Sequence, residues 1–419
     1  MQQITRLDNG LRVASVDMPQ ASSVCIGVWV AVGSRHENEV NNGAAHFIEH
    51  MLFKGTPNRS PKQIVAEIEG LGGYLNAYTS EDHTCYYARA RADRWRTLVD
   101  VLWDMYAGAT FPAAEVKRER EVIKEERAMY LDDPHHLNQE LLGRAMWPKH
   151  PLGRPIEGTN ETLDGLGRRE LKRFLSANYL AENTFVVAAG RVDHQKLVSL
   201  VKRLGKNTTG GKLPRFESAI SQQTRPRVEI EHRDIDQTQV ALGIRTCARN
   251  DQRRYAVRML SALLAENMSS RLYQVLRERH GLAYSVCSTS NSFDDTGDIT
   301  ITAGVDSDRL PRALELLQKE LRRIRTKAPS AAELRQSRDY VLGQFDIYLE
   351  SNENYMTWLG ECVVGHGSIA APSLVKRRIS RVTVADIQQA ARDFLRPENM
   401  TMTVVTPRRR DRRLEKYLT

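Results

Sequence analysis

The sequence predicts an α+β fold in which two homologous mixed α/β sandwich domains follow one another, and two observations carry this prediction. Strand-like and helix-like segments alternate irregularly, without the strand–helix–strand order of a doubly wound sheet. Helical and loop residues of the first half also return, in degraded form, in the second half. A polar stretch with Gly and Pro separates the halves. We therefore expect an N-terminal domain over 1–210, a linker over 211–226 and a C-terminal domain over 227–419, both of ordinary domain size.

Strands are predicted where short runs are rich in Val, Ile, Thr and aromatic residues. In the first half these runs cover residues 11–16, 25–32, 84–89 and 184–189. In the second half they cover residues 228–230, 240–244, 298–303 and 400–405.

Helices are predicted where apolar residues recur at intervals of three and four. In the first half such segments cover residues 61–71, 93–108, 115–131, 168–177 and 194–204. In the second half they cover residues 253–265, 270–279, 309–325, 331–349 and 384–394.

The clearest chemistry lies in a short motif, His46-Phe47-Ile48-Glu49-His50. On a helix, His46 and His50 are about one turn apart, so both imidazoles leave the same face. Two such histidines can bind a metal ion while the adjacent Glu49 accepts a proton from water. A lone histidine is more often a core or surface residue. Three polar groups among apolar neighbours are harder to explain in that way, since burying them unpaired is costly. The motif therefore favours a metal site.

A catalytic zinc ion needs a third protein ligand, because such sites use three and leave one position for water. The segment EVKREREVIKEERAMY, residues 115–130, is a strong helix former that is rich in glutamate. Most of these glutamates fit a solvated helix with surface salt bridges. Glu119 and Glu126 share one face, so Glu126 can ligate a metal while Glu119 orients a ligand from behind. Spacing alone does not choose between Glu125 and Glu126.

Three segments give the chain a resemblance to a known family. HFIEHMLFKGT, GGYLNAYTSEDHTCYYA and EREVIKEERAMYLDDP resemble the pitrilysin or M16 family of zinc metallopeptidases, whose zinc motif is inverted. The resemblance covers nearly the whole chain, and its length fits the short, single-chain bacterial members similar to mitochondrial processing peptidase. It implies two sandwich domains that face each other like a clam shell around a cavity.

The resemblance also implies roles for the motif residues. The family's distal ligand lies about 76 residues after the second histidine, which corresponds to Glu126, and its outer carboxylate corresponds to Glu119. One Zn²⁺ per chain is therefore expected on His46, His50 and Glu126, with Glu49 as general base.

Two further residues are singled out in the segment LRERHGLAYSV of the second half. Without the family, a helix-end Arg277 and a buried Tyr284 before a strand would be the simpler interpretation. In active members of the family, an Arg and a Tyr at this spacing reach across the cavity to the substrate. The resemblance thus implies that Arg277 binds a substrate carbonyl and that Tyr284 stabilises the oxyanion.

Substrate contacts are implied in two other places. Asn76-Ala77-Tyr78 matches the family's edge strand, to which an extended peptide adds as an extra strand, although an ordinary strand edge explains the segment equally well. Processing peptidases of the mitochondrial type hold a basic side chain with two acidic residues, whose positions are here His136 and Glu140. With Glu140 alone kept, a preference for basic residues near the cleavage point is expected to be weakened.

The second half has lost the metal residues. Placing Glu115 on Glu333 puts Ser337 at the position of Glu119 and Gln344 at the position of Glu126. The second half also contains no His-x-x-Glu-His motif. We therefore expect one copy of the repeat to bind metal and the other to serve a different purpose.

Composition narrows the partners and the compartment. The net charge is +9, with a basic run at residues 408–413. Such a run can bind nucleic acid or anionic membrane, but a solvated terminus is the commoner explanation, and no nucleic-acid motif lies nearby. The five cysteines form no Cys-x-x-Cys pair, which predicts neither disulfides nor a thiolate zinc site. No targeting segment or membrane-spanning run is visible, so a cytoplasmic protein is expected.

Three functions are consistent with these residues. The first is a zinc-dependent endopeptidase that cleaves short or unfolded peptides in an enclosed chamber, working as a homodimer or with a sibling chain. The second is a non-catalytic or partner-dependent subunit of a peptidase complex, whose usual mark, the loss of metal ligands, is absent here. The third is a peptide-binding or nucleic-acid-binding module that uses the basic tail. The retained ligands favour the first function.

Overall fold

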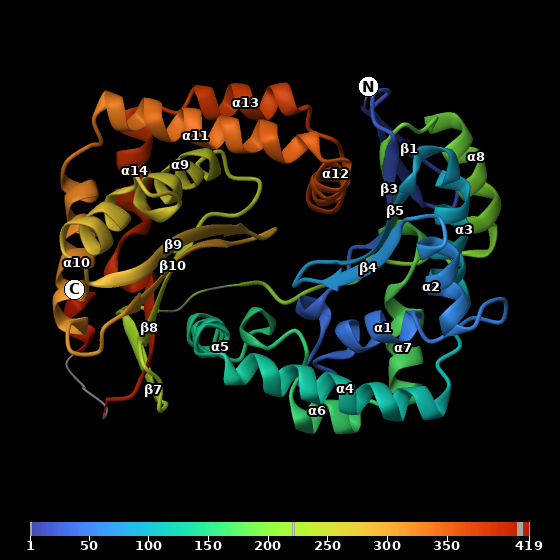
Figure 1. The fold of residues 1–419 in the computed structure, drawn as a ribbon, viewed down its shortest axis with the longest axis horizontal. Helices are drawn as coiled ribbons and strands as arrows, with labels where there is room; N and C mark the ends of the chain where they lie inside the picture. The colour runs from blue at the N-terminus through green and yellow to red at the C-terminus, as the bar shows by residue number, and fades with distance from the viewer. Residues whose placement is uncertain (1, 220, 222, 409–413, 419) are drawn as a thin grey trace. The chain divides into compact units, whose positions relative to one another are not determined.

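The computed structural model describes residues 2–219, 221, 223–408 and 414–418, and its chain is drawn in Figure 1. The described residues form two compact units that are each discontinuous in sequence. Unit 1 takes its residues from 1–128, 154–217 and 346–371, and unit 2 from 129–153, 218–345 and 372–419. The predicted domains 1–210 and 227–419 do not coincide with these units, because each half of the chain contributes a segment to the other. Most of the basic run, residues 409–413, lies outside the described residues.

Unit 1 is built on a six-stranded mixed sheet with the strand order β1-β2-β6-β3-β5-β4. Its strands are β1 (Gln2–Arg6), β2 (Arg12–Asp17), β3 (Ser23–Val30), β4 (Tyr74–Thr79), β5 (Thr84–Arg91) and β6 (Thr184–Gly190). The pair β2–β6 is parallel and the other pairs are antiparallel. Strands β1 and β4 are therefore the two edges of this sheet.

Helices cover both faces of this sheet (Figure 1). One face carries α1 (Ala44–Leu52), α2 (Pro61–Glu69), α3 (Trp95–Gly108) and α8 (His194–Leu204), and the other carries α12 (Asn352–His366). Helices α6 (Asn160–Gly165) and α7 (Arg168–Asn178) and most of α4 (Ala113–Asp132) complete unit 1. Because both faces are covered, the central strand β6 is buried along its whole length.

Unit 2 has a five-stranded sheet with the strand order β7-β11-β8-β10-β9. Its strands are β7 (Arg227–His232), β8 (Thr238–Thr246), β9 (Ala283–Ser292), β10 (Gly297–Val305) and β11 (Met400–Thr406). Helices α9 (Arg254–Ala265), α10 (Leu310–Thr326) and α14 (Val384–Phe394) share the core on one face, and α5 (Pro134–Met146) packs on the other. Helices α11 (Ala331–Glu350) and α13 (Pro372–Ser380) and the π-helix η6 (Tyr273–Arg279) complete it.

Short 3₁₀ helices join these elements at Ser34–His36, Ala92–Arg94, Pro151–Gly153, Ala181–Asn183, Gly205–Asn207, Pro397–Asn399 and Leu414–Tyr417. Within the predicted linker, the described residues belong to neither a helix nor a strand. In the described part of the chain, no helix is both long and apolar enough to cross a membrane.

The two units repeat one topology, which confirms the predicted fold class and internal repeat. Strands β2, β6, β3, β5 and β4 of unit 1 correspond to β7, β11, β8, β10 and β9 of unit 2, each set with one parallel pair. Helices α4 and α11 both have 20 residues. Their buried residues occupy matching positions, namely Val116, Glu119 and Ile123 in α4 and Leu334, Ser337 and Val341 in α11. The clam-shell arrangement of the two units stays a prediction.

Candidate metal centre

Helix α1 carries the His–Glu motif, and its start is set by a glycine and a buried carboxylate. Gly43 has a φ of 92°, and a Cβ atom there would lie 2.7 Å from the carbonyl oxygen of Glu157. The carboxylate of Glu37 accepts hydrogen bonds from the backbone N–H groups of Gly43 (2.8 Å) and Ala45 (2.7 Å). Glu37 is only 4% exposed, and burial raises its pKa to about 7 despite these donors. No local sequence pattern indicated this helix cap, because Glu37 lies outside α1.

Helices α1 and α4 bring the three predicted ligands together. The Nε2 atoms of His50 and His46 lie 3.5 and 3.9 Å from Oε2 of Glu126. Among the described residues, these three form the only group of at least three His, Cys, Asp or Glu whose ligand atoms lie mutually close, here within 4.8 Å. Ligands of a tetrahedral zinc ion lie about 3.3 Å apart, given bonds of about 2.0–2.1 Å. Glu126, rather than Glu125, thus completes the group, whose ligand atoms would have to move closer by up to about 1.5 Å to hold a zinc ion.

The two histidines differ in their affinity for protons. Burial and the neighbouring His50 lower the pKa of His46 to about 4, so its imidazole is neutral. For His50, burial lowers the pKa, but hydrogen bonds to Glu119 and Glu126 outweigh it and raise the pKa to about 9. Because a ligand imidazole is unprotonated, a metal ion that binds His50 displaces a proton.

Glu119 holds His50 from the side opposite to the ligand atom. Its Oε2 lies 3.2 Å from Nδ1 of His50, while its Oε1 lies 2.6 Å from Nζ of Lys54. A carboxylate on Nδ1 orients the imidazole so that Nε2 faces a metal ion. Burial raises the pKa of Glu119, but these two partners outweigh it and lower the pKa. Glu119 therefore lies where the sequence predicted. Lys54 was missed, because it lies beyond the end of α1, where helical spacing gives no signal.

Glu49 lies next to the ligands and is bonded to strand β4. The hydroxyl of Thr79 donates a hydrogen bond of 2.5 Å to Oε2 of Glu49. Burial raises the pKa of Glu49, while the hydrogen bond from Thr79 and the charge of His50 oppose this shift. The arrangement combines a metal-ligand group with a separate carboxylate that can accept a proton.

Family models and curated relatives show which known proteins this chain is similar to. Residues 12–160 match the family model described as Insulinase (Peptidase family M16), and residues 165–341 match Peptidase M16 inactive domain. The chain is 35% identical to an uncharacterized zinc protease of Mycobacterium tuberculosis, over 93% of this chain and 90% of the relative. It is 32% identical to the uncharacterized zinc protease YmxG of Bacillus subtilis, over 95% of this chain and 97% of the relative.

The chain belongs to peptidase family M16. A protease from Helicobacter pylori has the same fold, with a TM-score of 0.91, 23% identity and coverage of 97% of this chain and 99% of that one. An M16-like peptidase from Alicyclobacillus acidocaldarius gives a TM-score of 0.85 at 21% identity, with coverage of 97% and 98%. The second model, which carries the inactive-domain description, covers 165–217 of unit 1 and 218–341 of unit 2, and the described residues of unit 2 form no comparable ligand group.

The predicted peptide-binding segment of this M16 protein lies on the edge strand β4. Ala77 packs against the core on the α1 side of the sheet. Tyr78 points to the opposite face, where its ring packs edge-on against Trp29 at 5.9 Å. Asn76 accepts a hydrogen bond from the backbone N–H of Ala77 at 2.9 Å. Strand β4 is the last strand of its sheet, and peptide binding at this edge stays a prediction.

Arg277 and Tyr284 lie together in unit 2. The guanidinium carbon of Arg277 lies 5.0 Å from the ring centre of Tyr273 and 5.4 Å from that of Tyr284. Tyr284 is 73% exposed, so the simpler interpretation of a buried tyrosine is wrong. Arg277 belongs to the π-helix η6, a form found frequently at functional sites. Their contacts to substrate stay predictions.

Glu140 and His136 both lie on α5 of unit 2. The ring of His136 packs on Tyr130, with ring centres 5.3 Å apart. The role of Glu140 in binding a basic side chain also stays a prediction.

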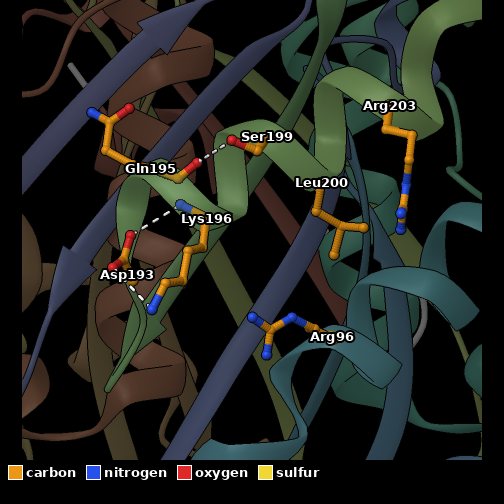
Figure 2. A pocket seen from close by; sticks show the side chains of 7 residues that line it. All are labelled: Arg96, Asp193, Gln195, Lys196, Ser199, Leu200 and Arg203. Atoms are coloured by element: carbon orange, nitrogen blue, oxygen red, sulfur yellow. Dashed lines mark hydrogen bonds and ion pairs between the residues drawn. The ribbon is translucent and has the colours of Figure 1, made fainter.

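A separate hollow in unit 1 has no catalytic character. It has a volume of about 570 Å³ and is lined by side chains of α3 and α8 (Figure 2). Its one carboxylate, Asp193, pairs with Lys196 at 3.7 Å, and the hydroxyl of Ser199 donates to the backbone carbonyl of Gln195. Asp193 and Ser199 thus make contacts local to α8, and the ligand group on α1 and α4 remains the candidate centre.

Proposed function

We propose that this M16 protein is a zinc-dependent endopeptidase that cleaves short or unfolded peptides in an enclosed chamber. The observation that carries the proposal is the ligand group of His46, His50 and Glu126 with the non-ligating Glu49 beside it. Zinc peptidases need these two components, a metal with an open position and a general base. The zinc protease names of the relatives support zinc as the metal.

The donor set fits one Zn²⁺ per chain. Two imidazole nitrogens and one carboxylate oxygen are typical zinc ligands and leave a fourth position open. His46 is neutral, as a ligand must be, and His50 has the outer carboxylate that a zinc-binding histidine usually has. When bound, zinc supplies Lewis acidity that brings the pKa of water toward neutrality.

Glu49 performs the proton transfers in this proposal. Thr79 occupies Oε2, so Oε1 is the oxygen that takes the proton of the attacking water. Burial favours the protonated carboxyl that results, which keeps the proton available for the leaving amine. In unit 2, Arg277 and Tyr284 would bind the substrate carbonyl and stabilise the developing oxyanion.

The edge position of β4 supports peptide binding by strand addition. A peptide that pairs with the N–H of Ala77 replaces the hydrogen bond that Asn76 makes there. Glu140 would favour a basic side chain in the substrate. These contacts use the peptide backbone and one charge, which suits extended rather than folded substrates.

We further propose a homodimer that functions in the cytoplasm, with no role for nucleic acid or membrane. All five cysteines are free thiols, which supports a reducing compartment. The alternative of a non-catalytic or partner-dependent subunit is less well supported, because the ligand group is complete. Analytical ultracentrifugation at several protein concentrations distinguishes a dimer from a monomer.

The deciding experiment measures zinc content and the cleavage of a quenched-fluorescence peptide library, with and without a chelator. We expect about one zinc per chain, chelator-sensitive cleavage and, for Glu49→Gln, a loss of about 10²–10⁴-fold in kcat with zinc retained. Glu121→Gln on the exposed side of α4 is the matched control and should leave both properties unchanged. Normal hydrolysis by Glu49→Gln, or a protein without zinc, would overturn the proposal.

A further inference from the structure

We propose that Thr79 is a positioning residue for the general base, and that it ties Glu49 to the same strand that receives the substrate. The inference rests on the proposed function of Glu49. Its starting point is the 2.5 Å hydrogen bond from the hydroxyl of Thr79 to Oε2 of Glu49, which connects α1 with the last residue of β4.

Thr79 is well suited to hold a flexible side chain. Glu49 has three rotatable side-chain bonds, and among the described residues only Thr79 donates a hydrogen bond to its carboxylate. Thr79 itself is stiff, because it is β-branched and its backbone pairs with Thr84 of β5. The hydrogen bond therefore fixes Oε2 of Glu49 to the sheet and leaves Oε1 for proton transfer.

The hydroxyl of Thr79 serves this contact rather than packing. Residues 75, 77 and 79 share one face of β4, because side chains alternate along a strand. Leu75 and Ala77 pack against the core cluster that contains Phe47 and Ile48 of α1. Thr79, the third residue on this face, instead directs its hydroxyl to Glu49 of α1. A valine would fill nearly the same volume there, so the hydroxyl is accounted for by its bond to the carboxylate.

This bond links substrate position to base position. A peptide that adds to the edge of β4 takes its register from the backbone of residues 76–78, and Thr79 follows directly in the same strand. The distance between a docked peptide and Glu49 is then determined within unit 1, by strand β4 and by the hydrogen bond between Thr79 and Glu49. Thr79 therefore contributes to the rate of the chemical step and little to peptide affinity.

The kinetic test compares Thr79→Val and Thr79→Ser with the wild type in the zinc-loaded protein. We expect Thr79→Val to lower kcat about 10- to 100-fold with KM and zinc affinity nearly unchanged, and Thr79→Ser to restore most of the rate. The matched control is Thr5→Val, which removes the threonine hydrogen bond to His194 from the other edge strand of the same sheet. A Thr79→Val enzyme with full kcat, or one that loses rate through KM alone, contradicts the inference.

Crystal structures of zinc-loaded wild type and Thr79→Val give a readout that does not depend on turnover. The inference requires Glu49 to keep its bond to Thr79 in the wild type and to change rotamer or become disordered in the variant. An unchanged Glu49 in Thr79→Val overturns it even if no peptide is cleaved. If the wild type cleaves peptides and Glu49→Gln does not, the proposed function holds even when Thr79→Val contradicts the inference about Thr79. If Glu49→Gln cleaves normally, the proposed function itself fails.

Discussion

Helices α4 and α11 are two copies of one element with different chemistry. Each has 20 residues and buries three side chains at corresponding positions. In α4 the middle buried residue is Glu119, and Glu126 follows two turns later. In α11 the same positions hold Ser337 and Gln344. The fold therefore tolerates both versions, and the metal group is an addition to the scaffold rather than a condition for it.

Helix α1 follows β3, and α9 follows the corresponding strand β8, so these two helices can be compared as well. Helix α1 buries His46 among apolar residues, whereas the buried residues of α9 are apolar apart from Ser261. Glu119 is compatible with burial because His50 and Lys54 bond both of its oxygens, while Ser337 needs no such partners. The candidate metal centre therefore depends on a few coupled side chains, and Glu119 and Glu126 can each be replaced by the residue at the corresponding position of unit 2.

The largest effect is expected from Glu126→Gln, which gives unit 1 the residue found at position 344. A neutral amide replaces the anionic ligand, so zinc affinity should fall more than about 100-fold, since losing outer contacts alone costs about 10- to 100-fold. Competition with a chromophoric chelator measures this. The reciprocal Gln344→Glu should not raise the zinc content, because α9 contains no histidine. A second zinc ion in that variant would contradict the comparison.

A smaller effect is expected from Glu119→Ser, which copies Ser337. Without the carboxylate on Nδ1 of His50, zinc affinity should fall about 10- to 100-fold. Lys54→Met should cost less, because Glu119 keeps its bond to His50. The double variant should resemble Glu119→Ser alone, with a coupling free energy of about 0.5–3 kcal/mol in a double-mutant cycle. Additive effects would show that Lys54 acts independently of Glu119.

The smallest effect concerns the start of α1 and its dependence on pH. Burial raises the pKa of Glu37 from about 4.5 to about 7 in the folded protein. The protonated carboxyl therefore stabilises the fold fully below a pH of about 4.5, and this contribution is lost as the pH rises through about 7. The unfolding free energy of the zinc-free wild type minus that of Glu37→Gln should therefore decrease from pH 5 to pH 8, as measured by urea denaturation.

The control for this prediction lies in unit 2, where Asp251 accepts a hydrogen bond of 2.8 Å from the backbone N–H of Arg253 before α9. The side chain of Arg253 lowers the pKa of Asp251, so its contribution is lost only as the pH falls below its ordinary range. The difference between wild type and Asp251→Asn should stay constant from pH 5 to pH 8. A similarly flat result for Glu37→Gln would show that its pKa is not raised.

Local patterns predicted most of the secondary structure, because periodic burial of one face is visible in the sequence. The helices at 194–204 and 384–394 were placed with the observed ends. Helices α5 and α12 were missed. Both come from a segment that packs on the sheet of the other half, where β11 and β6 are buried on both faces. No local pattern indicates which sheet a helix will cover.

Spacing along the chain was enough to predict the two candidate ligand histidines, the candidate base beside them and the repeat, because these features depend on local sequence. It narrowed the third ligand to neighbouring glutamates, and the family resemblance favoured Glu126. Tertiary structure brought Glu126 to the histidines and added Lys54, Thr79 and Glu37 around them. These contacts join residues from different elements or loops, and short-range periodicity carries no information about such encounters. The site could therefore be located from the sequence, whereas its supporting contacts required the fold.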